Sequence, residues 1–400
     1  MRAFILAAGE GTRMWPLTDT RPKPLIPIAN KPIIEYILDS LVAYGIKKIS
    51  ILIGYEGRKI ADRYKYEYKG ATIDYLYQEK RRGTGDAVMY ASKYEDDKFL
   101  IINGDLYFEP DAIVKLLKFD NAVLGIYMKD ASPYGLLVGN EHLKEIKEKV
   151  PNSSGWVNGG VYIFERKIFD YVKRVKLSPR GEIEFTDAIN LMAMEHEIKI
   201  VKYDGIWLDI GYPWHLLDAS KLLLERINCS VEGDVEENVV LRGKVCIGEG
   251  TRIMSGTYIE GPVLIGKNCK IGPNAYIRPY TVIGDNVHIG NSCEIKASII
   301  MNGSKVPHFN YVGDSIIGEN CNLGAGTKIA NLRLDERSIK VAVNGKIVDT
   351  HRRKFGAVMG DNVHTGINVS IDVGTMIGAY TSIAPGVRVK GIVATGSRIF

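Results

Sequence analysis

The chain has 400 residues, 46% of them hydrophobic and 25% charged, which is enough material for two or three globular domains. Its formal net charge of +5 is small for this length and no long basic run occurs, which argues against nucleic acid as a partner. The apolar run at residues 3–8 is too short for a signal peptide, and no stretch reaches the roughly 18 apolar residues of a membrane span. We therefore expect a protein of the cytoplasm with no membrane partner.

The first predicted element is a buried strand at residues 2–6, and a glycine-rich loop follows it directly. Gly9 and Gly11 lack the Cβ atoms that would keep backbone N–H groups away from phosphate oxygens. Arg13 and Lys23 bring positive charge to the same place. Because α/β folds bind ligands at the carboxyl edge of the sheet, the pattern predicts a nucleoside triphosphate site, although a plain tight turn uses the same residues.

The longer string resembles a known family. The segments LAAGEGTRM at 6–14, PKPL at 22–25 and NKP at 30–32 resemble the opening of the sugar-phosphate nucleotidylyltransferases, which join a sugar 1-phosphate to a nucleotide and release pyrophosphate. The resemblance implies that Arg13 and Lys23 are catalytic. It also implies that the nucleotide is bound by the loop residues Leu6, Ala7, Ala8, Gly9, Gly11 and Thr12.

Helix-like and strand-like segments alternate through the first half. Apolar residues at helical spacing predict a helix over 31–44, which Gly45 ends. The further predicted elements are strands at 48–53, 72–77 and 99–103 and a helix at 84–93. Such alternation is typical of a parallel sheet with helices on both faces, and we expect an α/β, Rossmann-like nucleotidyltransferase domain.

Gln78 is the only glutamine in the chain, and it stands shortly before Gly83 and Thr84. A composition that avoids heat-labile amides but keeps this one suggests that Gln78 has a task. A side-chain amide has a donor and an acceptor that suit the edge of a pyrimidine, and Gly83 would let backbone groups approach the base. The resemblance implies that this segment binds the base of UTP or dTTP. A glycine N-cap before a helix is the alternative.

Two acids stand where a predicted strand gives way to a glycine turn. Asp105 follows Asn103-Gly104, and Asp209 precedes Gly211 by two residues. Carboxylates at strand ends are well placed to hold Mg²⁺ between phosphoryl groups, while a surface turn is the alternative. The resembled family uses these positions as metal ligands, which implies that Asp105 and Asp209 hold Mg²⁺.

Between the two acids, the resemblance implies a sugar 1-phosphate site at Gly135, Glu148 and Asn158. A carboxylate and an amide can bind sugar hydroxyls through directional hydrogen bonds. Glu148 stands in the charged run 144–149, which could equally be a solvated face. The acids of 181–188 look like the start of a capped helix and stay outside the predicted site.

From Val235 onward the sequence repeats every six residues. Nine isoleucines occupy every sixth position from Ile247 to Ile295, a period that no single helix or strand has. Glycines that follow them, such as Gly266 and Gly284, predict corners with an unusual backbone. The pattern is similar to that of the hexapeptide-repeat acyltransferases, which implies a left-handed parallel β-helix and a homotrimer.

The amphipathic segment 214–227 precedes the repeat. We therefore expect a sugar-phosphate nucleotidyltransferase domain at 1–228 and a hexapeptide-repeat β-helix acetyltransferase domain at 229–400. The five cysteines all lie in the second half, are odd in number and show no C-x-x-C pattern, so neither a disulfide framework nor a zinc site is expected. Three of them, Cys269, Cys293 and Cys321, occupy a small inward slot of the repeat and are predicted to fill its core.

Two stretches, 301–314 and 331–356, interrupt the repeat, and interruptions of a solenoid are common places for function. The second predicts a β-hairpin over 341–348 with its turn at Asn344-Gly345. The first carries His308, which without its neighbours would be read as a surface histidine.

With its neighbours, the His308 stretch resembles a second activity. His308, Tyr311 and the GAGT of 324–327 are similar to the acetyltransferase half of the bacterial bifunctional enzyme that makes UDP-N-acetylglucosamine. That resemblance implies His308 as the catalytic base and an acetyl-CoA contact at Ala325. It implies sugar-phosphate contacts in the acetyl site at Arg278, Lys296, Tyr311, Asn331 and Lys340.

Together the resemblances imply a bifunctional enzyme that acetylates glucosamine 1-phosphate, or a related hexosamine phosphate, with acetyl-CoA and transfers UMP or dTMP to the sugar 1-phosphate. The base stays open because the spacing from Arg13 to Lys23 and the WLDIG of 207–211 look more like glucose-1-phosphate thymidylyltransferases. Two alternatives remain: a nucleotide-sugar pyrophosphorylase whose β-helix only oligomerises, and a catalytically silent sugar-nucleotide sensor.

Overall fold

The computed structural model describes residues 1–400, which divide into two compact units. The first unit comprises Met1–Glu10, Pro22–Leu25 and Pro32–Asp209, and the second comprises Gly11–Arg21, Ile26–Lys31 and Ile210–Phe400. No helix is both long enough and apolar enough to cross a lipid bilayer. The boundary predicted near Cys229 falls after helix α7 (Pro213–Leu224), which belongs by its contacts to the second unit.

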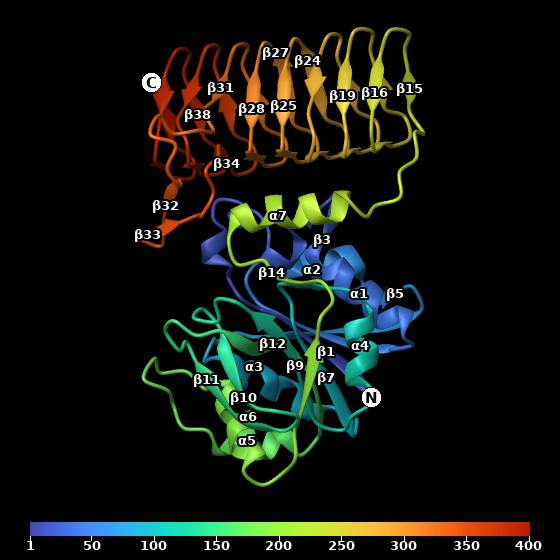
Figure 1. Cartoon of the computed structure of the whole chain (residues 1–400), viewed down its shortest axis with the longest axis vertical. Helices are drawn as coiled ribbons and strands as arrows, with labels where there is room; N and C mark the ends of the chain where they lie inside the picture. The colour runs from blue at the N-terminus through green and yellow to red at the C-terminus, as the bar shows by residue number, and fades with distance from the viewer. The chain divides into compact units, whose positions relative to one another are not determined.

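A ten-stranded mixed sheet forms the centre of the first unit (Figure 1). Its parallel part is, in spatial order, β7 (Lys98–Asn103), β1 (Arg2–Ala7), β4 (Lys48–Ile53) and β6 (Ala71–Tyr77). These four strands match the predicted ones to within one residue at each end. The predicted all-parallel sheet is wrong beyond β7, because β12 (Gly155–Glu165) pairs with β7 in the antiparallel direction.

The remaining strands of the first half are shorter or lie at the edges. In the sheet they are β5 (Glu67–Tyr68), β9 (Ala122–Met128), β10 (Gly135–Gly139), β11 (Leu143–Glu148) and β13 (Lys199–Tyr203). Outside it are β2 (Pro27–Ile28), β3 (Lys31–Pro32), and the antiparallel pair of β8 (Leu106–Phe108) with β14 (Trp207–Asp209).

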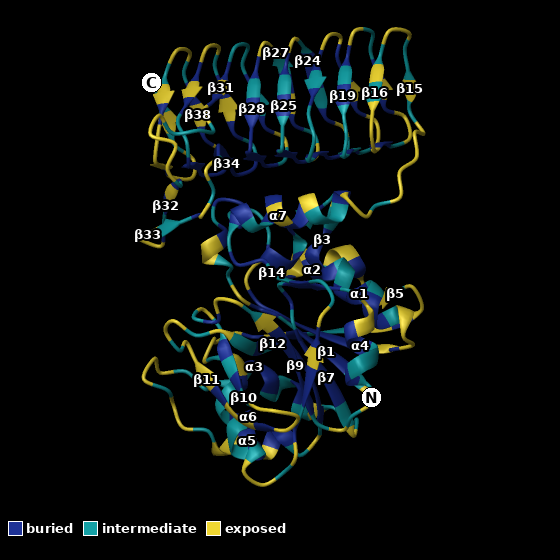
Figure 2. Ribbon diagram, viewed as in Figure 1, coloured by how far each residue is buried: buried dark blue, intermediate teal, exposed yellow.

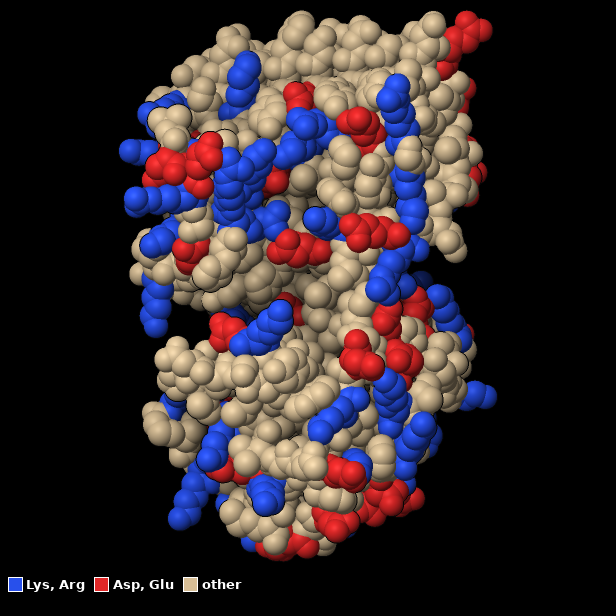
Figure 3. Space-filling view, viewed as in Figure 1, with Lys and Arg blue, Asp and Glu red and all other residues tan.

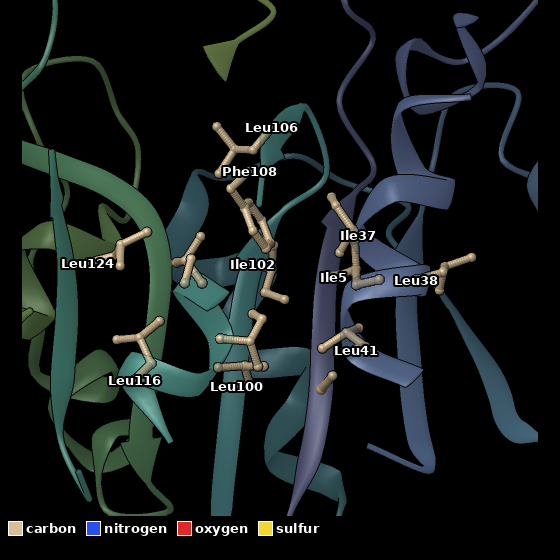
Figure 4. Close-up of a cluster of buried hydrophobic side chains, with 14 of the residues drawn as sticks. Ile5, Ile37, Leu38, Leu41, Leu100, Ile102, Leu106, Phe108, Leu116 and Leu124 are labelled. Carbon is tan, nitrogen blue, oxygen red and sulfur yellow. The ribbon is translucent and has the colours of Figure 1, made fainter. Parts of the chain in front are cut away.

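Helices cover both faces of this sheet, since its strands are apolar on both sides. Ala3 and Ile5 of β1 belong to the cluster with α1 (Ile33–Ala43), α2 (Arg58–Tyr64) and α4 (Asp111–Leu116), part of which Figure 4 shows. Phe4, pointing the other way, belongs to the cluster with α3 (Thr84–Met89), α5 (Ile168–Arg174) and α6 (Phe185–Ala193). In Figure 2 the central strands are accordingly coloured as buried.

The second unit contains a solenoid of three parallel sheets, to which each coil contributes one strand per sheet. The register places isoleucines of successive coils over one another, for example Ile253, Ile271 and Ile289. All nine isoleucines of the six-residue series are at most 1% exposed. The predicted inward orientation is therefore confirmed, and six residues make one side of a three-sided coil.

The strands of the three sheets follow one another in strict rotation. The first solenoid sheet contains β15 (Asp234–Val235), β18 (Arg252–Ile253), β21 (Lys270–Ile271), β24 (His288–Asn291), β27 (Lys305–His308), β30 (Asn322–Leu323), β35 (His364–Thr365), β38 (Ser382–Ile383) and β41 (Arg398–Ile399). The second contains β16 (Val240–Arg242), β19 (Tyr258–Glu260), β22 (Tyr276–Ile277), β25 (Glu294–Lys296), β28 (Tyr311–Gly313), β31 (Lys328–Ile329), β36 (Ser370–Ile371) and β39 (Arg388–Val389). The third contains β17 (Val245–Ile247), β20 (Val263–Ile265), β23 (Thr281–Ile283), β26 (Ile299–Ile300), β29 (Ile316–Ile317), β34 (Ala357–Met359), β37 (Thr375–Ile377) and β40 (Ile392–Val393).

Of the corner glycines, Gly272 has the expected unusual backbone, with φ of +100°, but Gly266 and Gly284 are needed for a different reason. Left-handed backbone occurs two residues further on, at asparagines such as Asn268 and Asn286. A Cβ on Gly266 would instead lie 2.7 Å from the carbonyl carbon of Gly284 in the next coil. The close stacking of coils, and not the backbone angle, therefore excludes a side chain at Gly266.

Of the two predicted interruptions, only the second is one. Residues 301–314 belong to a regular coil. One residue is missing before them, since Ile300 already pairs with Ile283, and Val306 and Val312 accordingly take the inward positions over Ile289 and Ile295. The missing residue shifts the phase of the six-residue pattern, which made a regular coil look like an insertion. The second stretch leaves the solenoid and forms the predicted hairpin, β32 (Lys340–Val343) and β33 (Lys346–Asp349), turning at Asn344 and Gly345 with positive φ.

Three of the five cysteines are free, and the other two form a disulfide. Cys269, Cys293 and Cys321 are free and buried, as predicted. The expectation of no disulfide is wrong, because Cys229 and Cys246 are bonded with their Cα atoms 4.5 Å apart. Cys246 lies in the first strand of the third solenoid sheet, and the bridge ties the end of the coil stack to the segment that leads in from α7.

Reduction of this bridge is expected to destabilise the second unit by about 3 kcal/mol, because the bridge closes a 17-residue loop in the unfolded chain. Thermal unfolding with and without reductant measures the effect, and a Cys229→Ser variant should be indifferent to reductant. Thiol titration of the unfolded, non-reduced protein should find the three free cysteines. A count of five would contradict the bridge.

Two N-terminal segments belong to the second unit and contact the solenoid there. Arg21 donates to Glu319 at 2.9 Å and to Asp361, and both the Arg21 and Asp361 side chains are almost fully buried. Asn30 donates to the carbonyl of Ile283 at 2.7 Å. Residues close to the start of the chain are therefore built into its last third.

Candidate active sites

The carboxyl end of β1 is crowded on both sides by glycine backbones. A Cβ on Gly104 would lie 2.7 Å from the carbonyl oxygen of Leu6, and one on Gly54 would lie 2.6 Å from that of Ala8. Ala7 and Ala8 are buried, whereas a Cβ on Gly9 would meet nothing within 4 Å. The predicted loop therefore turns from packed strand to open space at Gly9, where a phosphate could approach its backbone. No local pattern in the sequence singles out Gly54.

Lys23 and the two predicted metal ligands come together in the first unit. Lys23 is buried, and its Nζ donates to Asp105 Oδ2 at 2.7 Å. In the antiparallel pair of β8 with β14, Asp209 lies opposite Leu106, the neighbour of Asp105. Two carboxylates and one ammonium group from three distant parts of the sequence thus meet at one edge of the sheet.

The pair of carboxylates suits Mg²⁺. The chain contains no cluster of three or more His, Cys, Asp or Glu side chains arranged to hold a metal ion. Mg²⁺ is commonly bound by one or two carboxylates together with substrate phosphates and water, so Asp105 and Asp209 fit an ion that arrives with its nucleotide.

The predicted sugar residues also lie near this edge. Asn158 stands at a bulge of β12, where a Cβ on Gly160 would be 2.6 Å from Asn103 Nδ2. Gly135 lies opposite Glu148 in the pairing of β10 with β11, and a Cβ on Gly135 would be 3.1 Å from the Glu148 carboxylate. Burial, with the Glu148 charge in addition, raises the pKa of Tyr162, which also bonds Asn158. The structure therefore directs Glu148 toward β12.

The loop predicted to bind the base is held by two partners that the sequence did not reveal. Gln78 is buried, and its Nε2 donates to Asp86 at 3.1 Å. Gly83 has a φ of +105°, and a Cβ there would lie 2.4 Å from the Ile183 carbonyl. The room that Gly83 provides thus serves the chain's own packing. Thr84 Oγ1 accepts from the Phe185 N–H at 2.9 Å, so the segment before α6 shapes this loop from 100 residues away.

Gly11, Thr12 and Arg13 belong to the second unit by their contacts. Gly11 has left-handed backbone, with φ of +64°, and a 3-10 turn over Thr12–Met14 follows. The Arg13 guanidinium lies 5.4 Å from the centroid of the Tyr212 ring, and Thr12 Oγ1 accepts from Asn344 Nδ2 at 3.1 Å. Arg13 has no carboxylate partner, which leaves its charge for a phosphate.

His308 is the last residue of β27 and lies on the surface of the solenoid. Its carbonyl accepts from the Gly326 N–H at 3.0 Å, so the histidine is tied to the predicted GAGT turn in the next coil. Burial, with Lys270 and His308 among its charged neighbours, lowers the pKa of His288 in the preceding coil. Regular structure therefore holds the His308 backbone in place at the end of β27.

A hydrogen-bond network joins Lys296, Tyr311, Asp314 and Asn331. Asn331 Nδ2 donates to the Tyr311 hydroxyl at 3.2 Å and to Asp314 at 2.6 Å, and Lys296 donates to the same Asp314 oxygen at 3.1 Å. Burial, with Glu294 and Asp314 nearby, raises the pKa of Tyr311, so its phenol stays protonated at neutral pH. Asp314 was not among the predicted residues, although it links three that were.

The backbone N–H groups of the GAGT turn differ in whether they already have an acceptor within the chain. Gly324 donates to Thr365, Gly326 to His308, and Thr327 to Asn310 Oδ1 at 2.7 Å. The solenoid therefore already uses the backbone N–H groups of Gly324, Gly326 and Thr327. Among the four, the Ala325 N–H alone has no acceptor within the chain, in keeping with its predicted contact to acetyl-CoA.

The last two predicted residues of the acetyl site are placed differently. Arg278 follows β22 and donates to Glu294 at 2.8 Å, one coil from Lys296. Lys340 lies on the β32–β33 hairpin, is exposed to solvent, and makes no hydrogen bond or ion pair with the Tyr311 network. Arg278 and Lys296 are therefore brought together, and Lys340 is not.

Two known families match separate parts of the chain. The nucleotidyl transferase family matches residues 2–226, and the family described as the GMPPB C-terminal domain matches residues 259–370. A Bacillus anthracis structure described as a glucose-1-phosphate thymidylyltransferase superposes with a TM-score of 0.52 at 28% identity, covering 57% of this chain and 97% of that one.

Two curated relatives match at nearly full length. The bifunctional sugar-1-phosphate nucleotidylyltransferase/acetyltransferase of Sulfurisphaera tokodaii is 45% identical over 99% of both chains. The bifunctional protein GlmU of Methanocaldococcus jannaschii is 46% identical over 95% of this chain and 92% of its own. The chain therefore belongs to the family of bifunctional sugar-1-phosphate nucleotidylyltransferase/acetyltransferases.

Proposed function

We propose that this protein N-acetylates an amino-sugar 1-phosphate such as glucosamine 1-phosphate with acetyl-CoA, and joins the acetylated sugar phosphate to UMP or dTMP from UTP or dTTP. The product with UTP is UDP-N-acetylglucosamine. The observation that carries the proposal is that a chain related at full length to two-activity enzymes presents two separate polar sites, one around Lys23 and Asp105 and one around His308 and Tyr311.

In nucleotidyl transfer, a phosphate oxygen of the sugar 1-phosphate attacks the α-phosphorus in line, and the bond to the pyrophosphate leaving group breaks. Arg13, without a carboxylate partner, and Lys23, held ready by Asp105, bind phosphate oxygens. Mg²⁺, when bound by Asp105 and Asp209, would neutralise the negative charge that grows on the phosphates as pyrophosphate leaves. Gln78 and the loop at Gly83 and Thr84 hold the base, while Glu148 and Asn158 hold the sugar.

In acetyl transfer, the amino sugar arrives mainly as an ammonium ion and has to lose a proton before its nitrogen attacks the thioester carbon. His308 accepts that proton, since histidine is the side chain suited to proton transfer near neutral pH. The carbon–sulfur bond then breaks, and CoA leaves as its thiol after taking up a proton. The protonated Tyr311 donates to the substrate, and the Ala325 amide binds the carbonyl oxygen of the thioester.

The acetyl donor has room beside Tyr311. A cavity of about 320 Å³ extends over the second solenoid sheet from Tyr311 to Arg388. Flat stacked strands offer large self-complementary surfaces, and we propose that three copies of a left-handed hexapeptide-repeat solenoid associate around a common axis. Lys340 then reaches the acetyl site of a neighbouring copy, which fits its exposed position on the hairpin.

The trimer is tested by sedimentation equilibrium at micromolar concentration. A mass near three times 44.4 kDa is expected. A monomer under these conditions would contradict the proposal and would leave Lys340 without a site.

The function itself is tested by following pyrophosphate and free CoA thiol separately over a panel of sugar 1-phosphates with UTP and dTTP. Both products are expected, CoA only from amino sugars. Release of pyrophosphate alone would favour a pyrophosphorylase whose solenoid only oligomerises. Release of neither product would favour a catalytically silent sensor.

A further inference from the structure

The cavity beside Arg278 and Lys296 has a second wall that does not come from the solenoid. The cavity measures about 320 Å³, which is the size of a small-ligand site. Its solenoid wall includes Arg278, Tyr280 and Lys296, and its opposite wall includes Asp218 and Lys221 of α7 together with Arg352. The helix that precedes the repeat therefore closes a pocket of the acetyl site.

Helix α7 meets the solenoid unit along one face. The residues that make the contacts are four, three and four positions apart, a spacing that places them on one side of a helix: Trp214, Asp218, Lys221 and Glu225. The Trp214 ring lies edge-on to Phe355 with centroids 5.9 Å apart, and the Glu225 carboxylate accepts from the Tyr280 hydroxyl at 3.2 Å. Contacts along about three turns fix the rotation of the helix and aim Lys221 at the pocket.

The charges of this pocket do not cancel. Three ion pairs neutralise most of them: Arg278 with Glu294 at 2.8 Å, Lys296 with Asp314 at 3.1 Å, and Arg352 with Asp218. Lys221 has no carboxylate partner, and its ammonium group lies 4.7 Å from the centroid of the Tyr280 ring. Figure 3 shows Lys and Arg side chains gathered over the solenoid on the visible face, with acidic ones between them. The net positive charge of the pocket thus depends on Lys221.

Two further features favour an anionic ligand. The Nε atoms of Arg278 and Arg352 are both buried without a hydrogen-bond partner, so donors exceed acceptors around the pocket. Tyr280 has left-handed backbone, with φ of +65°, in a conformation that the solenoid most often gives to asparagine or glycine, such as Asn268 and Gly250. A bulky side chain in that conformation is costly, and such costs are concentrated at functional positions. Here this conformation places the Tyr280 ring beside the Lys221 ammonium group.

We propose that Lys221 binds the phosphate of the amino-sugar 1-phosphate, so that α7 supplies the selectivity of acetyl transfer for phosphorylated substrates. The inference rests on the proposed acetyl transfer and adds to it a residue outside the repeat. Arg278 and Lys296 hold the phosphate from the solenoid side, and Lys221 holds it from the other wall.

The test compares Lys221→Gln with Lys221→Arg, using glucosamine 1-phosphate and unphosphorylated glucosamine as acetyl acceptors. A hydrogen bond to a charged group is lost in the glutamine variant, so its KM for glucosamine 1-phosphate should rise about tenfold to a hundredfold, with kcat within about twofold. The efficiency with glucosamine should not change, because that substrate has no phosphate. Lys221→Arg should recover most of the loss.

A matched control is Lys270→Gln, which removes one lysine charge from the first solenoid sheet, outside the pocket. It should leave both KM values unchanged, and pyrophosphate release by every variant reports on folding. Equal losses with both acceptors would mean a structural role for Lys221, and an unchanged KM would mean no role, so either result overturns the inference. A wild-type protein that acetylates no amino-sugar phosphate would instead overturn the proposed function.

Discussion

Replacing Asp105 by alanine should lower pyrophosphate release at least a thousandfold at saturating Mg²⁺, while acetyl transfer stays close to wild type. Metal-assisted charge neutralisation contributes several kcal/mol to the transition state, and about 4 kcal/mol corresponds to that factor. The variant also frees Lys23, whose ammonium group is bonded to Asp105 at 2.7 Å. Steady-state assays over a range of Mg²⁺ concentrations measure the loss.

The control for this variant is Asp204→Ala, which removes an exposed carboxylate from the same unit and should have no effect. Asp209→Ala should reproduce the Asp105 result, since the two residues lie on paired strands. Wild-type turnover by Asp105→Ala at saturating Mg²⁺ would remove Asp105 from the metal site.

Replacing His308 by alanine should abolish release of CoA from acetyl-CoA and glucosamine 1-phosphate, with a loss of about a hundredfold to ten-thousandfold. The reason is that His308 is the proposed base, and the neighbouring Tyr311 is held protonated and cannot take the ammonium proton in its place. Pyrophosphate release from N-acetylglucosamine 1-phosphate and UTP should be nearly unchanged. The residual acetyl transfer should increase with pH, as free amine becomes available from solution.

His364→Ala is the matched control, because His364 lies exposed on the same solenoid sheet two strands beyond His308. It should behave as wild type in both assays. Retention of acetyl transfer by His308→Ala would exclude this histidine as the base, and loss of both activities would point to a role in folding.

The sequence predicted elements whose cause is local. The apolar strands β1, β4 and β7, the helix ended by Gly45, and the hairpin at Asn344-Gly345 all have a period or a turn signal within a few residues. The solenoid was predictable for the same reason, since each isoleucine repeats the environment of the one a coil earlier. Local periodicity does not state strand direction, however, so the antiparallel continuation through β12 was missed.

Other features depend on contacts between distant residues and could not be predicted. Nothing near Gly83 indicates that the Ile183 backbone occupies the space beside it. Cys229 and Cys246 are neighbours only because a coil returns the chain to its starting edge. The loss of one residue just before the stretch 301–314 was mistaken for an insertion, since a shifted phase and a true excursion look alike in sequence. Motifs therefore supplied candidate residues for both sites, whereas the partners that hold them could be found only from the fold.

The burial of Arg21 against Asp361 has a consequence for how the protein is made. The two residues are 340 positions apart, so at about 5–20 residues per second Arg21 leaves the ribosome roughly 20 to 70 seconds before its partner exists. During that interval the segment Gly11–Arg21 cannot take its final place, although the neighbouring strand β1 already can. The segment Gly11–Arg21 is therefore translated early but is among the last parts of the chain to reach its final contacts.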